Sequence, residues 1–134
     1  MNSPALVRVP LAVEIFSANL LPDPDFPGAV VAGNPEMRVK VVWESADKDQ
    51  LRGIWEVAPG KFTWRFDVDE FFVVVSGRAT VKGPDGQVFD MVPGSFVIFK
   101  PGDHTIWTVH ETLRKGFHMA GLNQMPTTDE SGPS

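Results

Sequence analysis

The stretch of sequence that decides the fold is residues 60–77, which read Gly60-Lys61-Phe62-Thr63-Trp64-Arg65-Phe66-Asp67-Val68-Asp69-Glu70-Phe71-Phe72-Val73-Val74-Val75-Ser76-Gly77. Alternation over residues 61–66 is typical of a half-buried β-strand. The run after Glu70 is apolar on both faces, as expected of a strand buried within a sandwich. A single carboxylate therefore opens a buried strand, and Gly77 closes it.

Turn residues divide the rest of the chain into short segments. Twelve prolines and twelve glycines separate runs rich in Val, Phe and Trp, and no long segment has apolar residues at helical spacing. We expect the last strands at 105–110 and 113–122, with Gly116 at a bulge. Turns that recur every eight to twelve residues, roughly, predict an all-β fold, a jelly-roll barrel or sandwich of antiparallel strands.

The length of 134 residues fits one domain with a sizeable core. We expect residues 1–35 to form an N-terminal strand, at 12–16, and a proline-rich loop arm. Residues 36–122 are expected to form the barrel. The polar residues 123–134, with Gly and Pro, predict a disordered tail. The sequence leaves open whether residues 1–35 swap onto a partner or fold back on their own sandwich.

Composition excludes several classes of function. The net charge is −5 and no block of five like charges occurs, which argues against nucleic acid or membrane as partners. The absence of cysteine excludes disulfides, a thiolate metal site and a cysteine nucleophile. Residues 1–10 have no signal-peptide pattern, and no apolar run approaches the roughly 20 residues of a membrane span. We therefore expect a cytoplasmic protein.

Two stretches resemble the sequence motifs of the cupin family. Glu70 and Gly77 match the end of the first motif, H-x-H-x(3,4)-E-x6-G, and Gly94 and Gly102 fall on the glycines of the second, G-x5-P-x-G-x2-H-x3-N. The phrases Gly53-Ile54-Trp55-Glu56 and Trp107-Thr108-Val109-His110-Glu111 resemble the small cupins related to ureidoglycine aminohydrolase and to the ethanolamine-utilisation cupins. The resemblance covers residues 36–121 and implies a cupin barrel that pairs into a homodimer.

The motif positions that hold a metal in cupins are almost all changed. By resemblance, a cupin metal site uses three histidines and a glutamate, and imidazole nitrogen suits transition metals. Of these ligands only Glu70 is kept. We therefore expect no metal ligands and no cofactor, apart from weak binding of a divalent ion by oxygen ligands around Glu70. In the first motif, the two histidine positions carry Thr63 and Arg65, or Trp64 and Phe66 if the shorter spacing is used. In the second motif, the histidine position carries Thr105.

A side-chain ion pair is the predicted replacement for the metal. A buried carboxylate needs a partner, and Arg65, which is always charged, is suitable; Lys115 or an indole are alternatives. Glu70 and Arg65 are the candidate catalytic residues. Glu70 would act as a general acid or base, and Arg65 would stabilise an oxyanion. Trp107 shares the face of Thr105, whereas Trp64 alternates with Arg65 and is expected in the core or at an interface. The candidate ligand-binding residues are Thr63, Arg65, Glu70, Phe99, Thr105, Trp107 and Lys115.

Three functions remain open at this point. The first is a pocket that binds a small polar or anionic metabolite, without a metal. The second, which the resemblance implies, is a metal-dependent hydrolase or aminohydrolase of nitrogen metabolism that uses Glu70. The third is a non-catalytic structural or regulatory module that acts as a dimer.

Overall fold

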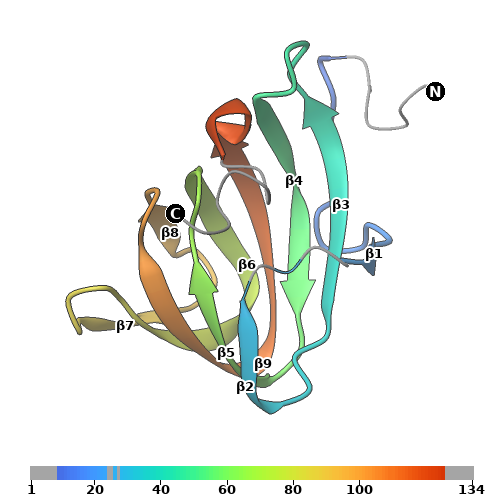
Figure 1. The fold of residues 1–134 in the computed structure, drawn as a ribbon. Helices are drawn as coiled ribbons and strands as arrows, with labels where there is room; N and C mark the ends of the chain where they lie inside the picture. The colour runs from blue at the N-terminus through green and yellow to red at the C-terminus, as the bar shows by residue number, and fades with distance from the viewer. Residues whose placement is uncertain (1–8, 24–25, 27, 126–134) are drawn as a thin grey trace.

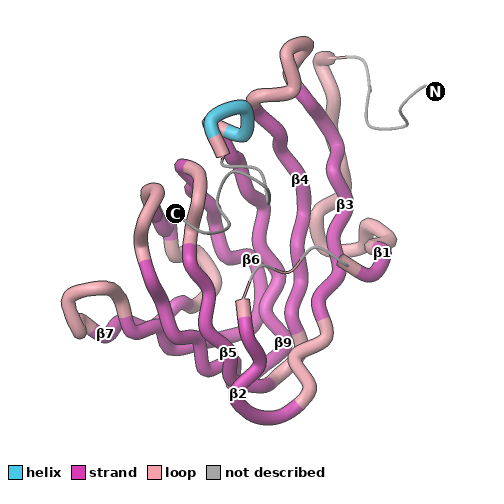
Figure 2. Tube along the Cα trace, in the orientation of Figure 1, coloured by secondary structure: helices cyan, strands magenta, loops and turns pink. Residues whose placement is uncertain are grey.

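The computed structural model describes residues 9–23, 26 and 28–125, and these residues form antiparallel β-strands without an α-helix (Figures 1 and 2). The all-β prediction is confirmed. No helix in the described part of the chain is long and apolar enough to cross a membrane. The elements are β1 (Leu21–Pro22), β2 (Ala29–Gly33), β3 (Met37–Glu44), β4 (Gln50–Val57), β5 (Gly60–Arg65), β6 (Asp69–Lys82), β7 (Val88–Met91), β8 (Phe96–Phe99), β9 (His104–Ala120) and the short 3-10 helix η1 (Leu122–Gln124).

Strand β9 holds the curled sheet together (Figure 1). Its first half pairs with β5 and its second half with β4, while β6 pairs along both halves on the opposite edge. The two strands expected at 105–110 and 113–122 are therefore one strand, because β6 gives both halves the same continuous neighbour. The bulge expected at Gly116 is also wrong: Gly116 pairs regularly with Ile54 and Val73, and the register shifts between β6 and β9 lie where residues 74–79 pair with residues 109–115.

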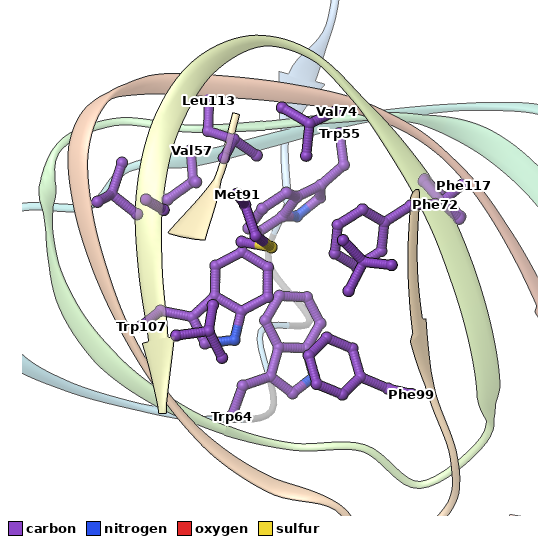
Figure 3. Packing of buried hydrophobic residues seen from close by; sticks show 14 of the residues in the cluster. Trp55, Val57, Trp64, Phe72, Val74, Met91, Phe99, Trp107, Leu113 and Phe117 are labelled. Carbon is purple, nitrogen blue, oxygen red and sulfur yellow. The ribbon is translucent and has the colours of Figure 1, made fainter. Parts of the chain in front are cut away.

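The concave face of the sheet is filled with aromatic side chains. Phe62 and Trp64 on β5 and Phe72 on β6 are buried, whereas their sequence neighbours Thr63 and Phe71 are not. Figure 3 shows the rings gathered between the strands. Packing of aromatic rings at 4.5 to 7 Å, roughly, contributes stability beyond the area they bury. This core is the floor on which the candidate site is built.

Gly77, which closes the decisive stretch, is required by the backbone. Its φ is 86°, in the left-handed region that glycine adopts without strain. A Cβ at this position would lie 2.0 Å from the carbonyl oxygen of Thr112 on β9. The glycine therefore lets β6 pass close to β9 at the point where the register shifts.

The arm and the tail differ in part from the predictions. Residues 12–16 are not a strand: a turn forms there, in which the Ala18 N–H donates to Glu14 (3.0 Å), and Arg114 binds the carbonyls of Ile15 and Ala18. These bonds satisfy backbone groups that a strand would pair elsewhere. The start of the predicted tail is held by a hydrogen bond from the Asn123 N–H to the Asp49 carboxylate, and residues 126–134 lie outside the described range.

Candidate functional site

A buried lysine–glutamate pair lies on the concave face of the barrel. Glu70 is near the start of β6, and Lys115 is in the second half of β9. The Lys115 Nζ donates to Glu70 Oε2 at 2.6 Å, and the two side chains are 1% and 2% exposed. Burial of charges is unfavourable unless they are paired, so each side chain depends on the other for its place in the core.

Aromatic rings surround the ammonium group of Lys115. Its Nζ lies 3.9 Å from the ring centroid of Phe72, 4.6 Å from Trp55 and 5.2 Å from Trp64. The rings attract the cation through their electron-rich faces, but they also exclude water. Burial lowers the pKa of Lys115, while the charge of Glu70 and the hydrogen bond with it act in the opposite direction.

The second oxygen of Glu70 has no donor within the described protein. Glu70 Oε1 is buried and makes no hydrogen bond with the described residues, whereas Oε2 accepts one from Lys115. An acceptor that is buried without a partner costs roughly 1–3 kcal/mol, and more when it is charged. The carboxylate therefore keeps one acceptor that none of the described residues fills.

A cavity of about 490 Å³ opens above this pair. Its polar lining consists of Glu70 and Lys115 with Asp23, Arg65 and Asp67. Ligand cavities in proteins are commonly about 300–1,000 Å³, mostly apolar, with a few convergent polar groups. This cavity has that character. Its apolar walls include Val39 and Val41 of β3, Leu51 and Trp55 of β4, Trp64 of β5, and Phe117 and Met119 of β9.

The predicted ion pair between Glu70 and Arg65 is wrong. The Arg65 side chain is 60% exposed at the rim of the cavity, where its Nε lies 3.5 Å from Asp67 Oδ1. The alternation of β5 turns Trp64 inward, so Arg65 faces outward. Glu70 is instead paired with Lys115, one of the alternatives that the sequence left open.

The other predicted ligand-binding residues do not line the cavity. Thr105 and Trp107 are buried below it: the Thr105 hydroxyl donates to the Trp64 carbonyl (2.7 Å) and accepts from the Trp107 indole (3.0 Å). Phe99 is buried against Phe66, with ring centroids 4.3 Å apart. Thr63 faces away from the cavity and accepts a bond from the Ala29 N–H. Of the seven candidates, Arg65, Glu70 and Lys115 reach the cavity.

Sequence reasoning missed part of the cavity wall. Trp64 is in the core, as predicted, but it also lines the cavity together with Phe66. The alternation of Phe62, Trp64 and Phe66 contained this signal, because large rings gain more from burial than threonine or arginine. Asp23 accepts a bond from the Trp55 indole at 3.3 Å, and no motif in the sequence predicted that contact.

The donor groups do not fit the metal site that the cupin motifs imply. The described residues contain no group of three or more His, Cys, Asp or Glu that could hold a metal ion. His104 and His110 are exposed, and His118 bonds with Arg52 away from the cavity. The inner carboxylate contacts an ammonium group, whose charge opposes a bound cation.

Comparison with protein families agrees with this barrel. The model of the EutQ-like cupin domain matches residues 44–117, more than half of the chain. The protein is a EutQ-like cupin. The family resemblance read from the motifs is therefore confirmed. No curated protein matches this EutQ-like cupin.

Solved structures share the fold of this EutQ-like cupin. A protein with unknown function from Pseudomonas syringae pv. tomato is 21% identical over 77% of the chain, with a TM-score of 0.68, and the chain spans only 45% of its length. A putative ethanolamine utilization protein Q from Salmonella typhimurium is 13% identical, with 79% and 100% of the two chains covered and a TM-score of 0.59. The EutQ protein of Clostridium difficile is 16% identical, with 66% and 71% covered and a TM-score of 0.57. At these identities the similarity establishes the fold alone.

Proposed function

We propose that this EutQ-like cupin binds a small molecule that has an apolar body and a hydrogen-bond-donating head. The observation that carries the proposal is the buried Oε1 of Glu70, which has no donor among the described residues, in a side chain that belongs to the cavity lining. A ligand hydroxyl, amine or amide would supply that donor. The apolar body would lie against Trp55, Trp64 and Leu51.

The charges around the cavity favour a neutral or cationic head. Lys115 is neutralised by Glu70, and the remaining charged groups of the lining are Asp23, Asp67 and Arg65. Arg65 and Asp67 already pair with each other at the rim. An anionic head, which the sequence allowed, would meet a lining that carries three carboxylates and two basic groups.

A thermal-shift screen against small metabolites tests the proposal. A ligand that binds the folded state raises the melting temperature by mass action. We expect the shift to disappear in Glu70→Gln and to persist in Glu111→Gln, a matched control at an exposed glutamate that pairs with Arg78. A ligand whose shift survives Glu70→Gln would contradict the proposal, as would a screen with no ligand.

The same screen, repeated with Zn²⁺ and Mn²⁺, tests whether ligand binding requires a metal ion. We expect no shift that depends on both the metal and Glu70, because the inner donor set contains one carboxylate and an ammonium group. A Glu70-dependent shift with either metal would favour the metal-dependent aminohydrolase instead.

The homodimer and the cytoplasmic location stay predictions. The observation that favours a dimer is an exposed apolar surface on the convex face of β6 and β8, formed by Phe71, Val73, Phe96 and Ile98. A two-fold contact would bury this surface against the same surface of a second copy. Sedimentation velocity should show a dimer that Ile98→Glu dissociates; a monomeric wild-type protein would exclude it.

A further inference from the structure

Lys115 differs from every other lysine in the chain. The chain has six lysines, and Lys115 is buried whereas the other five are exposed. A lysine of the barrel wall that served only for solubility would point outward, as those five do. Lys115 instead directs its amine to the cavity floor, beside a carboxylate and among aromatic rings.

We propose that Lys115 is a carbonyl-reactive amine, which forms an imine with a small aldehyde or ketone in the cavity while Glu70 transfers the protons. This inference deepens the proposed binding function and rests on it, because the cavity is the same. It adds a substrate class, small apolar carbonyl compounds, and a covalent step. Such a compound has no donor of its own, and the hydroxyl group of the carbinolamine supplies the donor to Glu70.

The surroundings meet the requirements of imine chemistry. Attack on a carbonyl needs a neutral amine, and desolvation in an apolar pocket is the usual way to obtain one from lysine. Burial among the rings of Phe72, Trp55 and Trp64 lowers the pKa of Lys115. A proton acceptor must also lie within hydrogen-bond distance, and Glu70 Oε2 lies 2.6 Å from the amine.

The two oxygens of Glu70 have separate roles in the reaction. Oε2 accepts a proton from the ammonium group, and the amine nitrogen then forms a bond to the carbonyl carbon as the C=O π bond breaks. The carboxylic acid returns the proton to the new oxygen, which gives a carbinolamine. Oε1, which has no donor in the part of the chain that the structure describes, can accept a hydrogen bond from that hydroxyl group.

Loss of water completes the step without an outside reagent. The nitrogen of the carbinolamine still carries two protons and a positive charge, and it first gives one proton to the Glu70 carboxylate. The lone pair left on the nitrogen forms the C=N bond, and the hydroxyl group leaves as water with the proton that Glu70 returns. In the net reaction, an ammonium group and a carbonyl compound are converted into a protonated imine and one water molecule. The protonated imine keeps the positive charge that Glu70 and the rings stabilise in the free protein.

Reductive trapping tests the proposal on the full chain. The protein is incubated near pH 7 with butanal, benzaldehyde or butanone and with cyanoborohydride, and is then analysed by intact mass and peptide mapping. We expect one main adduct, heavier by the mass of the carbonyl compound minus one oxygen atom, on Lys115. Its yield should exceed that on each of the five exposed lysines by about tenfold, because burial among the rings favours the neutral amine of Lys115.

Two variants and a pH series separate Lys115 from background reaction. Lys115→Arg keeps the charge but cannot form an imine, so the main adduct should disappear and the background on other lysines should remain. Glu70→Gln should slow trapping by about tenfold, as expected for loss of a proton-transfer group. As pH rises, trapping at Lys115 should level off earlier than at exposed lysines; Glu70 and Asp23 are the charged groups that act on its amine from neighbouring segments.

The internal comparison makes the test independent of whether the variants fold. An adduct spread evenly over the exposed lysines of the wild-type protein, with Lys115 unmodified, would overturn the imine proposal. If a ligand of the thermal-shift screen still required Glu70 in that case, the binding function would stand and only the covalent step would fall.

Discussion

Arg114 and Lys115 are neighbours on β9, yet they belong to opposite faces of the barrel. On the convex face, Arg114 pairs with Glu56 at 3.0 Å and also binds the carbonyls of Ile15 and Ala18. On the concave face, Lys115 pairs with Glu70, and one carboxylate oxygen has no donor among the described residues. The outer pair connects two parts of the chain, whereas the inner pair leaves bonding capacity at a cavity. The difference separates a structural ion pair from a candidate functional one.

The largest expected effect is the loss of the inner pair. Lys115→Ala leaves the Glu70 carboxylate buried without a counter-charge, which should cost about 3–5 kcal/mol in the free energy of unfolding, measured by urea denaturation. The double variant Lys115→Met with Glu70→Leu should regain most of that loss, because an apolar pair of similar volume needs no compensation. A loss below about 1 kcal/mol for Lys115→Ala would mean that the pair is not desolvated.

A smaller effect is expected when the outer pair is removed. Arg114→Ala deletes hydrogen bonds from a charged group and should cost roughly 1–3 kcal/mol. Amide hydrogen exchange should accelerate around residues 15–18, because Arg114 holds that turn on the barrel. Arg78→Ala is the matched control, since Arg78 contacts Glu111 at 3.8 Å in an exposed pair, and unchanged exchange in Arg114→Ala would contradict the anchoring role.

Arg65 distinguishes the structure from the sequence-based hypothesis. Arg65→Ala removes an exposed pair at the cavity rim and should change stability by less than about 1 kcal/mol in the same urea assay. If Arg65 were the buried partner of Glu70, its loss would match that of Lys115→Ala. A result of that size would therefore refute the inward orientation of Trp64.

The smallest effect concerns His118 on the convex face. Partial burial and then the charge of Arg52 lower the pKa of His118 below its usual 6.5. The folded state thus holds the neutral ring more strongly than the unfolded state, so its contribution to stability is complete above pH 6.5 and is lost as the pH falls. NMR titration should show the lowered pKa, and Arg52→Ala should raise it. An unchanged pKa in Arg52→Ala would exclude the electrostatic contribution.

The sequence predicted the barrel and the burial of Glu70, but not the partner of Glu70 with certainty. Turn spacing and the interval from Glu70 to Gly77 were sufficient for the fold, because both reflect backbone constraints that act locally. Leu113 and Phe117 flank Lys115 at the two-residue period, so a signal for its burial was present. The preference for Arg65 came from motif spacing, which permits two registers, and the burial of the large rings of β5 decided between them.

Other features depend on contacts that no local pattern encodes. The Trp55–Asp23 bond joins residues 32 positions apart, and Arg114 reaches carbonyls nearly 100 positions away. Glu70 Oε1 has no donor because none of the described residues that surround it in the assembled barrel offers one. Such features arise only when the strands are assembled, since each depends on several segments at once.

The arrangement of indoles supplies an optical signal from inside the barrel. The chain has four tryptophans and no tyrosine, so indole dominates its ultraviolet emission. Trp55, Trp64 and Trp107 lie within 6 Å of the Lys115 ammonium group, whereas Trp43 stacks with Arg52 elsewhere. A molecule that enters the cavity changes the polarity around Trp55 and Trp64, which line it, so occupancy can be followed by fluorescence without a dye or label.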